Sequence, residues 1–246
     1  MAEKHYYEQQ RFCEDYIIPF LEKHLSKFRS LKILEVGSGE GGVVSVLKKA
    51  GYNIEGFEIS ASRVKTAKEK DPQLPLFVGD LTDAKILDGR EESYDLIILR
   101  DVIEHISNKK SAFEHIYRML KPNGYFYITF PPRFSPFAGH QQNGKTVLRL
   151  FPFLHLLPDF LIDFFCKIFD EDIRVIKAVK LNFKIGLTLN DFEKLIEDNK
   201  FNIVKMELFF SRPIFKLRYK IPTIKFPNIV FLREFFATGC ETLLKK

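Results

Sequence analysis

A chain of 246 residues, 46% of them hydrophobic, is long enough for one large α/β domain with an insertion, or for a domain and a small cap. Its three cysteines, Cys13, Cys166 and Cys240, have no paired spacing, which argues against a disulfide framework and a zinc site. No stretch of about 20 uninterrupted apolar residues occurs, and the polar N-terminal sequence is unlike a signal peptide. We therefore expect a cytoplasmic protein that is at most peripheral to a membrane.

The positive charge of the chain is concentrated near its C-terminus. The formal net charge is +6, and residues 201–246 alone carry nine Lys or Arg against three Glu. The remaining residues are therefore balanced in charge. A basic segment of this kind can attract an anionic substrate, a nucleic acid or a membrane surface, or it can be an ordinary solvated face.

The N-terminal region is expected to be helical. Residues 5–28 place apolar side chains at helical spacing, and Pro19 is expected to divide them into two helices. Tyr6, Tyr7 and Arg11 are candidates for ligand contact, although packing and surface roles are the simpler interpretation for each.

The most informative stretch runs from Leu31 to Gly42 and reads LKILEVGSGEGG. Its apolar residues predict a short buried strand that ends at a glycine turn, and residues 43–50 then predict a helix. Strand, turn and helix begin a βαβ unit, whose ligand site lies at the carboxyl end of the strand. Gly37, Gly39 and Gly42 also fit the GxGxxG pattern of dinucleotide sites.

Glu35 distinguishes between two kinds of ligand for this turn. Its carboxylate is expected at the tip of the strand, where it would repel a pyrophosphate and attract a ligand with ammonium and sulfonium groups. The alternative is a solvated carboxylate or one that caps a helix. The sequence from Leu34 to Gly41, LEVGSGEG, resembles motif I of class I methyltransferases that depend on S-adenosylmethionine (SAM). The resemblance implies that SAM is the cofactor and that this turn binds it.

The next two predicted strands supply further cofactor candidates. Residues 52–57 predict a strand ending at Glu58, and a carboxylate there can accept both ribose hydroxyls, in NAD enzymes as well as in methyltransferases. Residues 74–78 predict a third strand followed by Asp80, for which the resemblance implies acceptance of the adenine amino group; an Asx turn or helix cap is the alternative. The expected cofactor-binding residues are Glu35, Gly37, Ser38, Gly39, Glu58, Ile59, Asp80, Leu81 and Arg100.

A dense polar cluster follows the fourth predicted strand, residues 94–99. Asp101, Glu104 and His105 resemble the signature of ubiquinone-biosynthesis-like small-molecule methyltransferases. Three roles compete: His105 or Asp101 acts as a general base on a substrate hydroxyl, the cluster binds a divalent cation, or it shapes the pocket and caps a helix. Asp101 stands where cation-binding relatives have a Glu with a longer reach, so no metal is expected.

The resemblance continues to Pro132, through a predicted helix at 107–120 and a fifth strand at 125–130, and then departs. Residues 133–186 are a Phe-rich insertion, for which we expect two short amphipathic helices joined at a proline. They could form a lid that walls a lipophilic pocket, lie on a membrane surface, form a dimer face, or simply bury their own phenylalanines. His140, near the start of the insertion, is a second candidate base or substrate contact.

The C-terminal part is expected to complete the sheet. Residues 188–199 predict a helix, residues 201–210 a sixth strand, and residues 234–244 an antiparallel seventh strand that inserts between the fifth and the sixth. The basic and aromatic residues between the last two strands include three prolines, which favour a meandering flap. Nucleic-acid binding is conceivable there, but no RNA-binding module motif accompanies it.

Together these observations predict an α/β fold with a doubly wound, seven-stranded Rossmann-like sheet and an α-helical lid insertion. The expected parts are a helical segment over the cofactor pocket (1–30), the SAM-binding core (31–132), the lid (133–186), and the rest of the sheet with a basic flap (187–246).

The expected function is SAM-dependent methyl transfer, at oxygen, to a small acceptor that is lipophilic or linked to a glycan. His105, Asp101 and His140 are the catalytic candidates. The expected partners are the acceptor and a membrane surface contacted by the lid, and nucleic acid is not expected. The alternatives are an NAD(P)-dependent oxidoreductase, or a non-catalytic or nucleic-acid-associated protein with the same fold.

Overall fold

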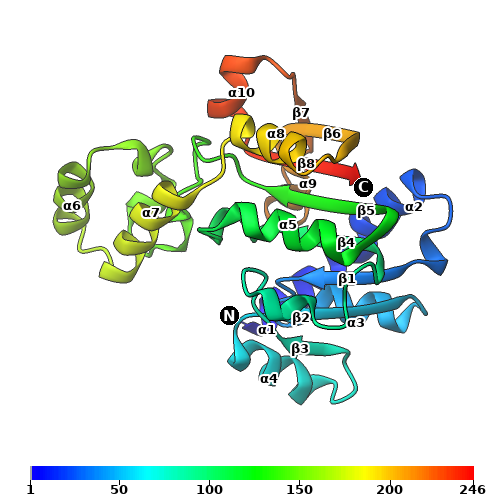
Figure 1. The fold of residues 1–246 in the computed structure, drawn as a ribbon. Helices are drawn as coiled ribbons and strands as arrows, with labels where there is room; N and C mark the ends of the chain where they lie inside the picture. Colours follow the sequence, from blue (N-terminus) through cyan, green and yellow to red (C-terminus); the bar gives the residue numbers. More distant parts are fainter. Residues whose placement is uncertain (1) are drawn as a thin grey trace.

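One mixed β-sheet organises the chain, with helices on both of its faces (Figure 1). The computed structural model describes residues 2–246. The order of the strands across the sheet is β3-β2-β1-β4-β5-β8-β6-β7. The strands are β1 (Lys32–Val36), β2 (Asn53–Glu58), β3 (Leu76–Val78), β4 (Tyr94–Arg100), β5 (Leu120–Phe130), β6 (Asn202–Ser211), β7 (Ile224–Phe226) and β8 (Gly239–Lys245).

The first five strands pair in parallel, and β8 lies antiparallel between β5 and β6. The predicted fold class and the antiparallel insertion are therefore confirmed. The predicted number of seven strands is wrong, because β7 pairs with the outer edge of β6 as an eighth. This strand has only three residues and lies between prolines, so its sequence pattern is that of a loop.

The helices of the described part are α1 (Ala2–Phe12), α2 (Ile18–His24), α3 (Gly42–Lys49), α4 (Ala61–Lys70), α5 (Lys109–Met119), α6 (Asp159–Ile168), α7 (Ile173–Ile185), α8 (Leu189–Asp198), α9 (Pro213–Tyr219) and α10 (Val230–Phe236). A π-helical turn, Cys13–Ile17, joins α1 to α2. Pro19 does not divide two helices as expected, because it lies in the first turn of α2, where its missing N–H costs nothing.

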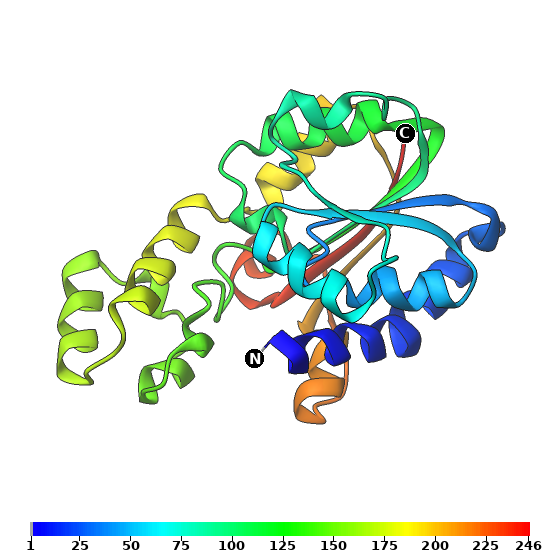
Figure 2. The ribbon, with the colours of Figure 1, turned by 90° about the horizontal axis from the view of Figure 1, so that it is seen from below.

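Two apolar cores lie on opposite faces of the sheet, because side chains of successive strand residues point to opposite sides. Ile33 and Leu96 pack against α1–α4, whereas Leu34 and Ile97 pack against α5 and α8. Figure 2 shows this layering from below, with α1 and α2 running along one face. Such double coverage explains why the parallel strands are apolar throughout.

The insertion forms a separate small body beyond the carboxyl ends of the strands (Figures 1 and 2). It has its own core, which includes Leu148, Leu154, Ile162, Cys166 and Val179. The prediction of two helices joined at a proline is wrong in detail. Its N-terminal part forms only short 3₁₀ turns, and the two helices, α6 and α7, meet at a short turn without proline.

The segment between β6 and β8 is more ordered than the predicted flap. It contains α9, β7 and α10. These elements have seven, three and seven residues. Pro213 does not prevent α9, because it stands in the first turn of that helix. In the described part of the chain, no helix combines the length and the apolar character that crossing a bilayer requires.

Candidate active site

The glycine turn after β1 is held in one conformation by the neighbouring strand. The N–H groups of Gly37 and Ser38 both donate to the carbonyl oxygen of Phe57, at 2.9 and 3.0 Å. Gly37 has φ +71°, and a Cβ there would lie 2.4 Å from Cγ2 of Val102. A side chain at Gly37 would therefore strain the backbone and collide with the loop after β4. Gly37 is partly exposed, whereas Gly39, Gly41 and Gly42 are buried under neighbouring side chains.

Glu35 lies below this turn as a buried carboxylate. Only 3% of the residue is exposed, and its Oε2 has no hydrogen-bond partner among the described residues. Burial raises its pKa to about 7, although the nearby Arg100 opposes this shift. An unpaired buried carboxylate oxygen is an acceptor for a cationic donor, so the residues fit the ammonium group of SAM.

Glu58 is also buried, but its two oxygens are already bonded to backbone. Oε2 accepts from the N–H of Gly39 at 2.9 Å, and Oε1 accepts from Ser60 at 3.0 Å. The carboxylate therefore fixes both the glycine turn and the start of α4, while each oxygen keeps a lone pair for a ribose hydroxyl. The next residue, Ile59, is 66% exposed, and Val78 on the neighbouring strand is 54% exposed. Together they leave an apolar surface beside the carboxylate.

Asp80 forms the Asx turn that was the alternative to its adenine role. Its Oδ1 accepts from both the N–H and the hydroxyl of Thr82, each at 2.8 Å. Both bonds use one oxygen, so the turn does not consume the whole carboxylate. Leu81 is buried, and its carbonyl oxygen accepts from Nδ1 of His115 at 2.7 Å.

Helix α1 covers the glycine turn from outside the sheet. Nδ1 of His5 lies 2.6 Å from Oε2 of Glu40, and Gln9 Oε1 accepts from the N–H of Gly42 at 3.2 Å. These contacts come from residues that the sequence pattern did not single out, because nothing local links position 5 to position 40. Tyr6, which the sequence suggested as a ligand contact, instead donates its hydroxyl to Oγ of Ser45 at 3.1 Å.

Tyr7 and Arg11 lie on the outer side of α1. Tyr7 is 59% exposed, and Arg11 pairs with Asp15 on the surface. Both line a wide surface groove along the C-terminal half of α3, away from the glycine turn. Tyr7 and Arg11 are therefore surface residues, which agrees with the simpler of the two interpretations given for them.

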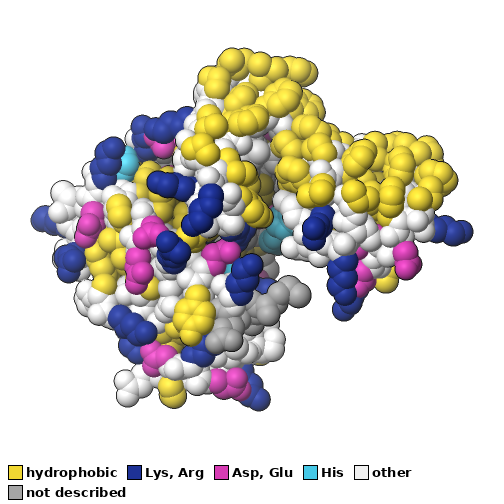
Figure 3. All heavy atoms as spheres, turned by 180° about the vertical axis from the view of Figure 1, so that it is seen from behind, with side chains coloured by type: hydrophobic (Ala, Val, Ile, Leu, Met, Phe, Trp, Pro, Cys, Tyr) yellow, Lys and Arg dark blue, Asp and Glu magenta, His cyan; other side chains and the backbone are white. Residues whose placement is uncertain are grey.

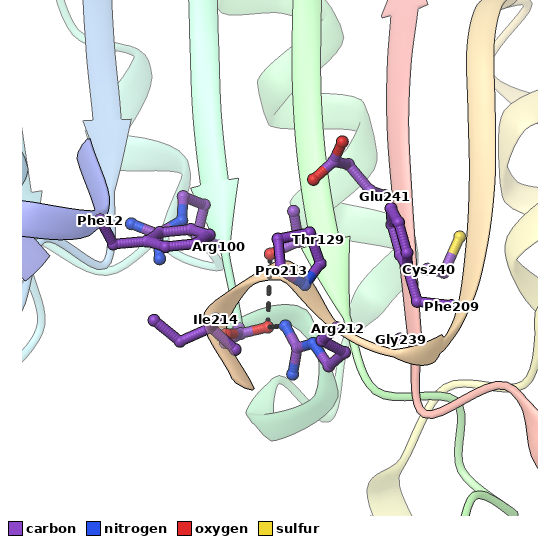
Figure 4. A pocket seen from close by; sticks show the side chains of 11 residues that line it. Phe12, Arg100, Thr129, Phe209, Arg212, Pro213, Ile214, Gly239, Cys240 and Glu241 are labelled. Atoms are coloured by element: carbon purple, nitrogen blue, oxygen red, sulfur yellow. Dashed lines mark hydrogen bonds and ion pairs between the residues drawn. The ribbon is translucent and has the colours of Figure 1, made fainter. Parts of the chain in front are cut away.

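Asp101 is bound to a basic residue from the far end of the sheet. Its Oδ1 pairs with Nη2 of Arg212, which follows β6, and accepts from Oγ1 of Thr129 at 3.3 Å (Figure 4). Burial alone would raise the pKa of Asp101, but Arg212 and Arg100 hold it below its usual range. The residue stays ionised and paired, which weakens its case as a general base.

Arg100 lies beside this pair, on a cavity of about 20 Å³ lined by residues from α1, β5, β6 and β8 (Figure 4). Its guanidinium lies over the ring of Phe12, 4.9 Å from the centroid, and its buried Nε has no partner among the described residues. Glu241 lines the same cavity and accepts from the hydroxyls of Tyr16 and Tyr127 at 2.9 and 3.0 Å. The cavity holds about one water, so these residues support the site rather than enclose a ligand.

His105 and His140 face one another at the mouth of the lid. Their rings lie edge to face, with centroids 4.9 Å apart. Burial lowers the pKa of His140 to about 4, helped by His105, and burial also lowers the pKa of His105. Both imidazoles are therefore neutral at pH 7. The structure thus brings together two of the predicted catalytic residues from segments 35 positions apart in the chain.

Asn182 of the lid helix α7 fixes the tautomer of His105. Its Nδ2 donates to the carbonyl oxygen of Gly139 at 3.2 Å, so its Oδ1 faces Nδ1 of His105, also at 3.2 Å. Nδ1 then carries the hydrogen, and Nε2 keeps a lone pair for a proton. Asn182 is a residue that sequence reasoning missed.

Glu104 completes a set of side chains that could hold a cation. It is 4% exposed, and neither carboxylate oxygen has a partner among the described residues. Burial raises its pKa to about 8, and Asp101 adds to the rise. One ligand atom each from Glu104, His105 and His140 lie within 4.8 Å of one another. The donor set differs from the one weighed from sequence, because His140 takes the place of Asp101.

Two imidazoles and a carboxylate suit a transition metal such as Zn²⁺ better than Mg²⁺, which prefers oxygen ligands. Two roles are therefore chemically consistent with this cluster: a neutral histidine base, or a cation site.

Comparison with known proteins identifies the family. A family model described as a methyltransferase domain matches residues 5–159. A ubiquinone biosynthesis O-methyltransferase of Rickettsia canadensis is 28% identical over 119 residues, which cover 47% of this chain and 49% of the relative. A phosphoethanolamine N-methyltransferase of Plasmodium falciparum is 34% identical over 101 residues, 40% of this chain and 38% of the relative. The matches thus span half or less of these curated relatives.

Solved structures show the same fold over almost the whole chain. A SAM-dependent methyltransferase from Archaeoglobus fulgidus matches with a TM-score of 0.57 and 16% identity, over 97% of each chain. At that identity the likeness concerns the fold alone. The family match and the strand order agree, and the chain belongs to the methyltransferase domain family, in the class I branch whose cofactor is S-adenosylmethionine.

Proposed function

We propose that this protein transfers a methyl group from SAM to an oxygen of a small, lipophilic acceptor. The observation that carries the proposal is the contact between two neutral histidines, His105 in the loop after β4 and His140 near the start of the Phe-rich lid. The similarity to ubiquinone biosynthesis O-methyltransferases supports oxygen as the methylated atom, and the similarity to a phosphoethanolamine N-methyltransferase favours nitrogen. A glycan-linked acceptor is the variant of this proposal that the sequence also suggested.

The cofactor side would be held by residues that the structure leaves with spare hydrogen-bonding capacity. Glu35 offers an unpaired oxygen to an ammonium group, and Glu58 offers lone pairs to ribose hydroxyls. Ile59 offers exposed apolar surface to the adenine ring, with Asp80 beside it. SAM supplies a methyl group that is already activated, so the acceptor needs only alignment, exclusion of water and loss of one proton.

His105 would remove that proton. Asn182 holds the ring so that the lone pair of Nε2 is available, and the lowered pKa keeps it neutral at pH 7. The pKa of His140, about 4, makes it a weaker base than His105. We therefore assign it contact with the acceptor rather than proton removal. Asp101 would act through Arg212 by fixing the loop after β4.

The lid would exclude water from this step. Two contacts join it to the loop after β4, which carries His105. Asn182 contacts His105. Nζ of Lys109 donates to the carbonyl oxygen of Ile106 in this loop and to that of Ile185 in the lid. Besides the acceptor, the partner we propose is a membrane surface in contact with the lid, where a lipophilic acceptor would be found.

The proposal is tested by following conversion of SAM to S-adenosylhomocysteine with hydroxylated lipophilic compounds, such as alkylated catechols, and with phosphoethanolamine as the competing class. Turnover of the catechols alone, with the methyl group on oxygen by mass spectrometry, is the expected result. Turnover of phosphoethanolamine alone would contradict it.

A further inference from the structure

Helix α10 is amphipathic in the reverse of the usual sense. Val230 is 64% exposed and Phe231 75% exposed, whereas Arg233 and Glu234 are only 3% and 7% exposed. A surface helix normally buries its apolar side chains and exposes its charges. Figure 3 shows the result as a broad hydrophobic region over this part of the molecule.

Both buried charges of α10 are paired with neighbouring polar groups, so the reversal is specified by the fold. The guanidinium of Arg233 donates to Glu193 at 2.6 Å and to Asn228 and Asn190 at 2.8 Å. The carboxylate of Glu234 accepts from the first N–H groups of α8, those of Leu189 and Asn190, at 3.1 and 3.0 Å. A carboxylate at a helix N-terminus satisfies otherwise unpaired donors and interacts well with the helix dipole. These bonds hold α10 with its apolar side outward.

Helix α6 of the lid presents a second apolar stripe. Phe160, Phe164 and Ile168 follow one another at intervals of four residues and are 69%, 56% and 58% exposed. The opposite side of α6 buries Ile162 and Cys166 in the small core of the lid. Leu150, which precedes this helix, is 66% exposed.

Aromatic contacts run from α10 to helix α7 of the lid. Phe231 contacts Phe235 within α10, Phe235 stacks on Phe134 at the base of the lid, and Phe134 contacts Phe183 of α7; the ring centroids are 5.6, 5.6 and 6.1 Å apart. Figure 3 shows hydrophobic surface over both bodies on the same side of the molecule, with histidine in the hollow between them. The lid part of this surface adjoins the site, because Asn182 of α7 contacts His105.

We propose that this α10–lid face, formed by Leu150, Phe160, Phe164, Ile168, Val230 and Phe231, docks on an anionic phospholipid bilayer. The charge near α10 favours that occupant, because residues 212–232 contain no Asp or Glu, and Lys216 and Lys220 among them are exposed with no ion pair to the described residues. The other three basic residues of this segment, Arg212, Arg218 and Lys225, pair with Asp101, Glu8 and Glu207. Helices of seven and ten residues are too short to span a bilayer but suit its interface. This inference adds α10 as a second membrane anchor to the lid contact proposed above. It rests on the proposed function, because a lipophilic acceptor gives the enzyme a reason to bind a membrane.

The test is flotation of the full chain with vesicles of phosphatidylcholine and phosphatidylglycerol. Two double variants, Val230→Glu/Phe231→Glu and Phe160→Glu/Phe164→Glu, place charges on already exposed positions and should fold normally. We expect each to lower the vesicle-bound fraction about ten-fold, because each removes two apolar side chains from the interface. The matched control is Ile203→Glu/Val204→Glu, on exposed apolar residues at the amino end of β6, and should float like the unchanged protein.

The proposal is overturned if the unchanged protein does not float, or if either double variant floats as well as it does. It is also overturned if the face proves to join two copies of the chain, seen as a dimer in light scattering that the α10 variant converts to a monomer without loss of vesicle binding. SAM binding, measured on the same samples, should not change. Because flotation needs no methyl transfer, failure here leaves the proposed reaction standing, and an inactive protein that floats leaves the docking surface standing.

Discussion

The two halves of the carboxyl edge of the sheet are built in different ways. The half expected to hold the cofactor takes all of its candidate residues except Arg100 from one continuous stretch, Glu35 to Leu81, which folds into β1, β2 and β3 with their helices. The acceptor half joins residues from the loop after β4, the lid and the end of β6, so that Arg212 pairs with Asp101 across 111 positions. A local site shows its pattern in the sequence, whereas a site assembled from distant segments does not.

This difference predicts that the two halves can be damaged separately. Changes in the cofactor half should weaken SAM binding, and changes in the acceptor half should lower turnover while SAM still binds.

The largest expected effect is that of His105→Ala. Loss of a general base should lower kcat by about 10²- to 10⁴-fold. Isothermal titration should show the same SAM affinity as in the unchanged protein. His24→Ala is the matched control, because His24 contacts only the carbonyl oxygen of Phe20 on α2 among the hydrogen bonds of the described residues. Equal turnover in the two variants would remove His105 from the mechanism.

The next effect is that of Glu58→Ala in the cofactor half. Hydrogen bonds to a charged group contribute about 1.5–3 kcal/mol, so SAM affinity should fall by about 10- to 100-fold. The Glu58→Gln variant keeps the shape of the side chain, so its SAM affinity should lie between those of the unchanged protein and the Glu58→Ala variant. Glu69→Ala, on the exposed side of α4, is the control. If SAM binds the Glu58→Ala protein with unchanged affinity, the ribose role is lost, and with it the division between the halves.

Glu35 should make SAM binding depend on pH. Its pKa of about 7 means that the carboxylate is mostly protonated at pH 6 and mostly ionised at pH 8. Only the ionised form attracts an ammonium group, so affinity should rise by about five-fold between pH 6 and pH 7. Above pH 7 it should level off, because the ammonium group of SAM loses its own proton at about pH 8. Glu35→Gln should bind more weakly and with little dependence on pH. An equally steep pH profile in that variant would assign the titration to another group.

The smallest effect is that of Asn182→Ala, which tests a positioning role in the acceptor half. The variant loses its hydrogen bonds to His105 and to Gly139. Loss of the bond to His105, about 1 kcal/mol, should lower kcat about five-fold and leave SAM affinity unchanged. Without Asn182 the hydrogen of His105 is free to move to Nε2, so the pH profile of kcat should also change. Asn199→Ala, which loses only a bond to Leu195 on α8, is the control. A drop in kcat with an unaltered pH profile would indicate a merely structural role.

Local patterns made much of the fold predictable. The glycine turn and the apolar strand runs each depend on neighbouring residues, and the structure shows them as expected. The N-terminal part of the lid and the segment before β8 were predicted less well, because prolines and phenylalanines there fit turns, short helices and a three-residue strand equally.

The sequence by itself determined the family, the cofactor and the places where the strands end, because glycine conformation and apolar periodicity act over a few residues. Only the tertiary structure decided which polar groups are paired and which are not. In the folded protein Asp101 pairs with Arg212, and Asn182 contacts His105. Glu35 and Glu104 keep carboxylate oxygens without a hydrogen-bond partner among the described residues. The tertiary structure also turned the apolar side of α10 outward. Burial and charge pairing depend on segments more than 40 positions apart, and no local pattern records them.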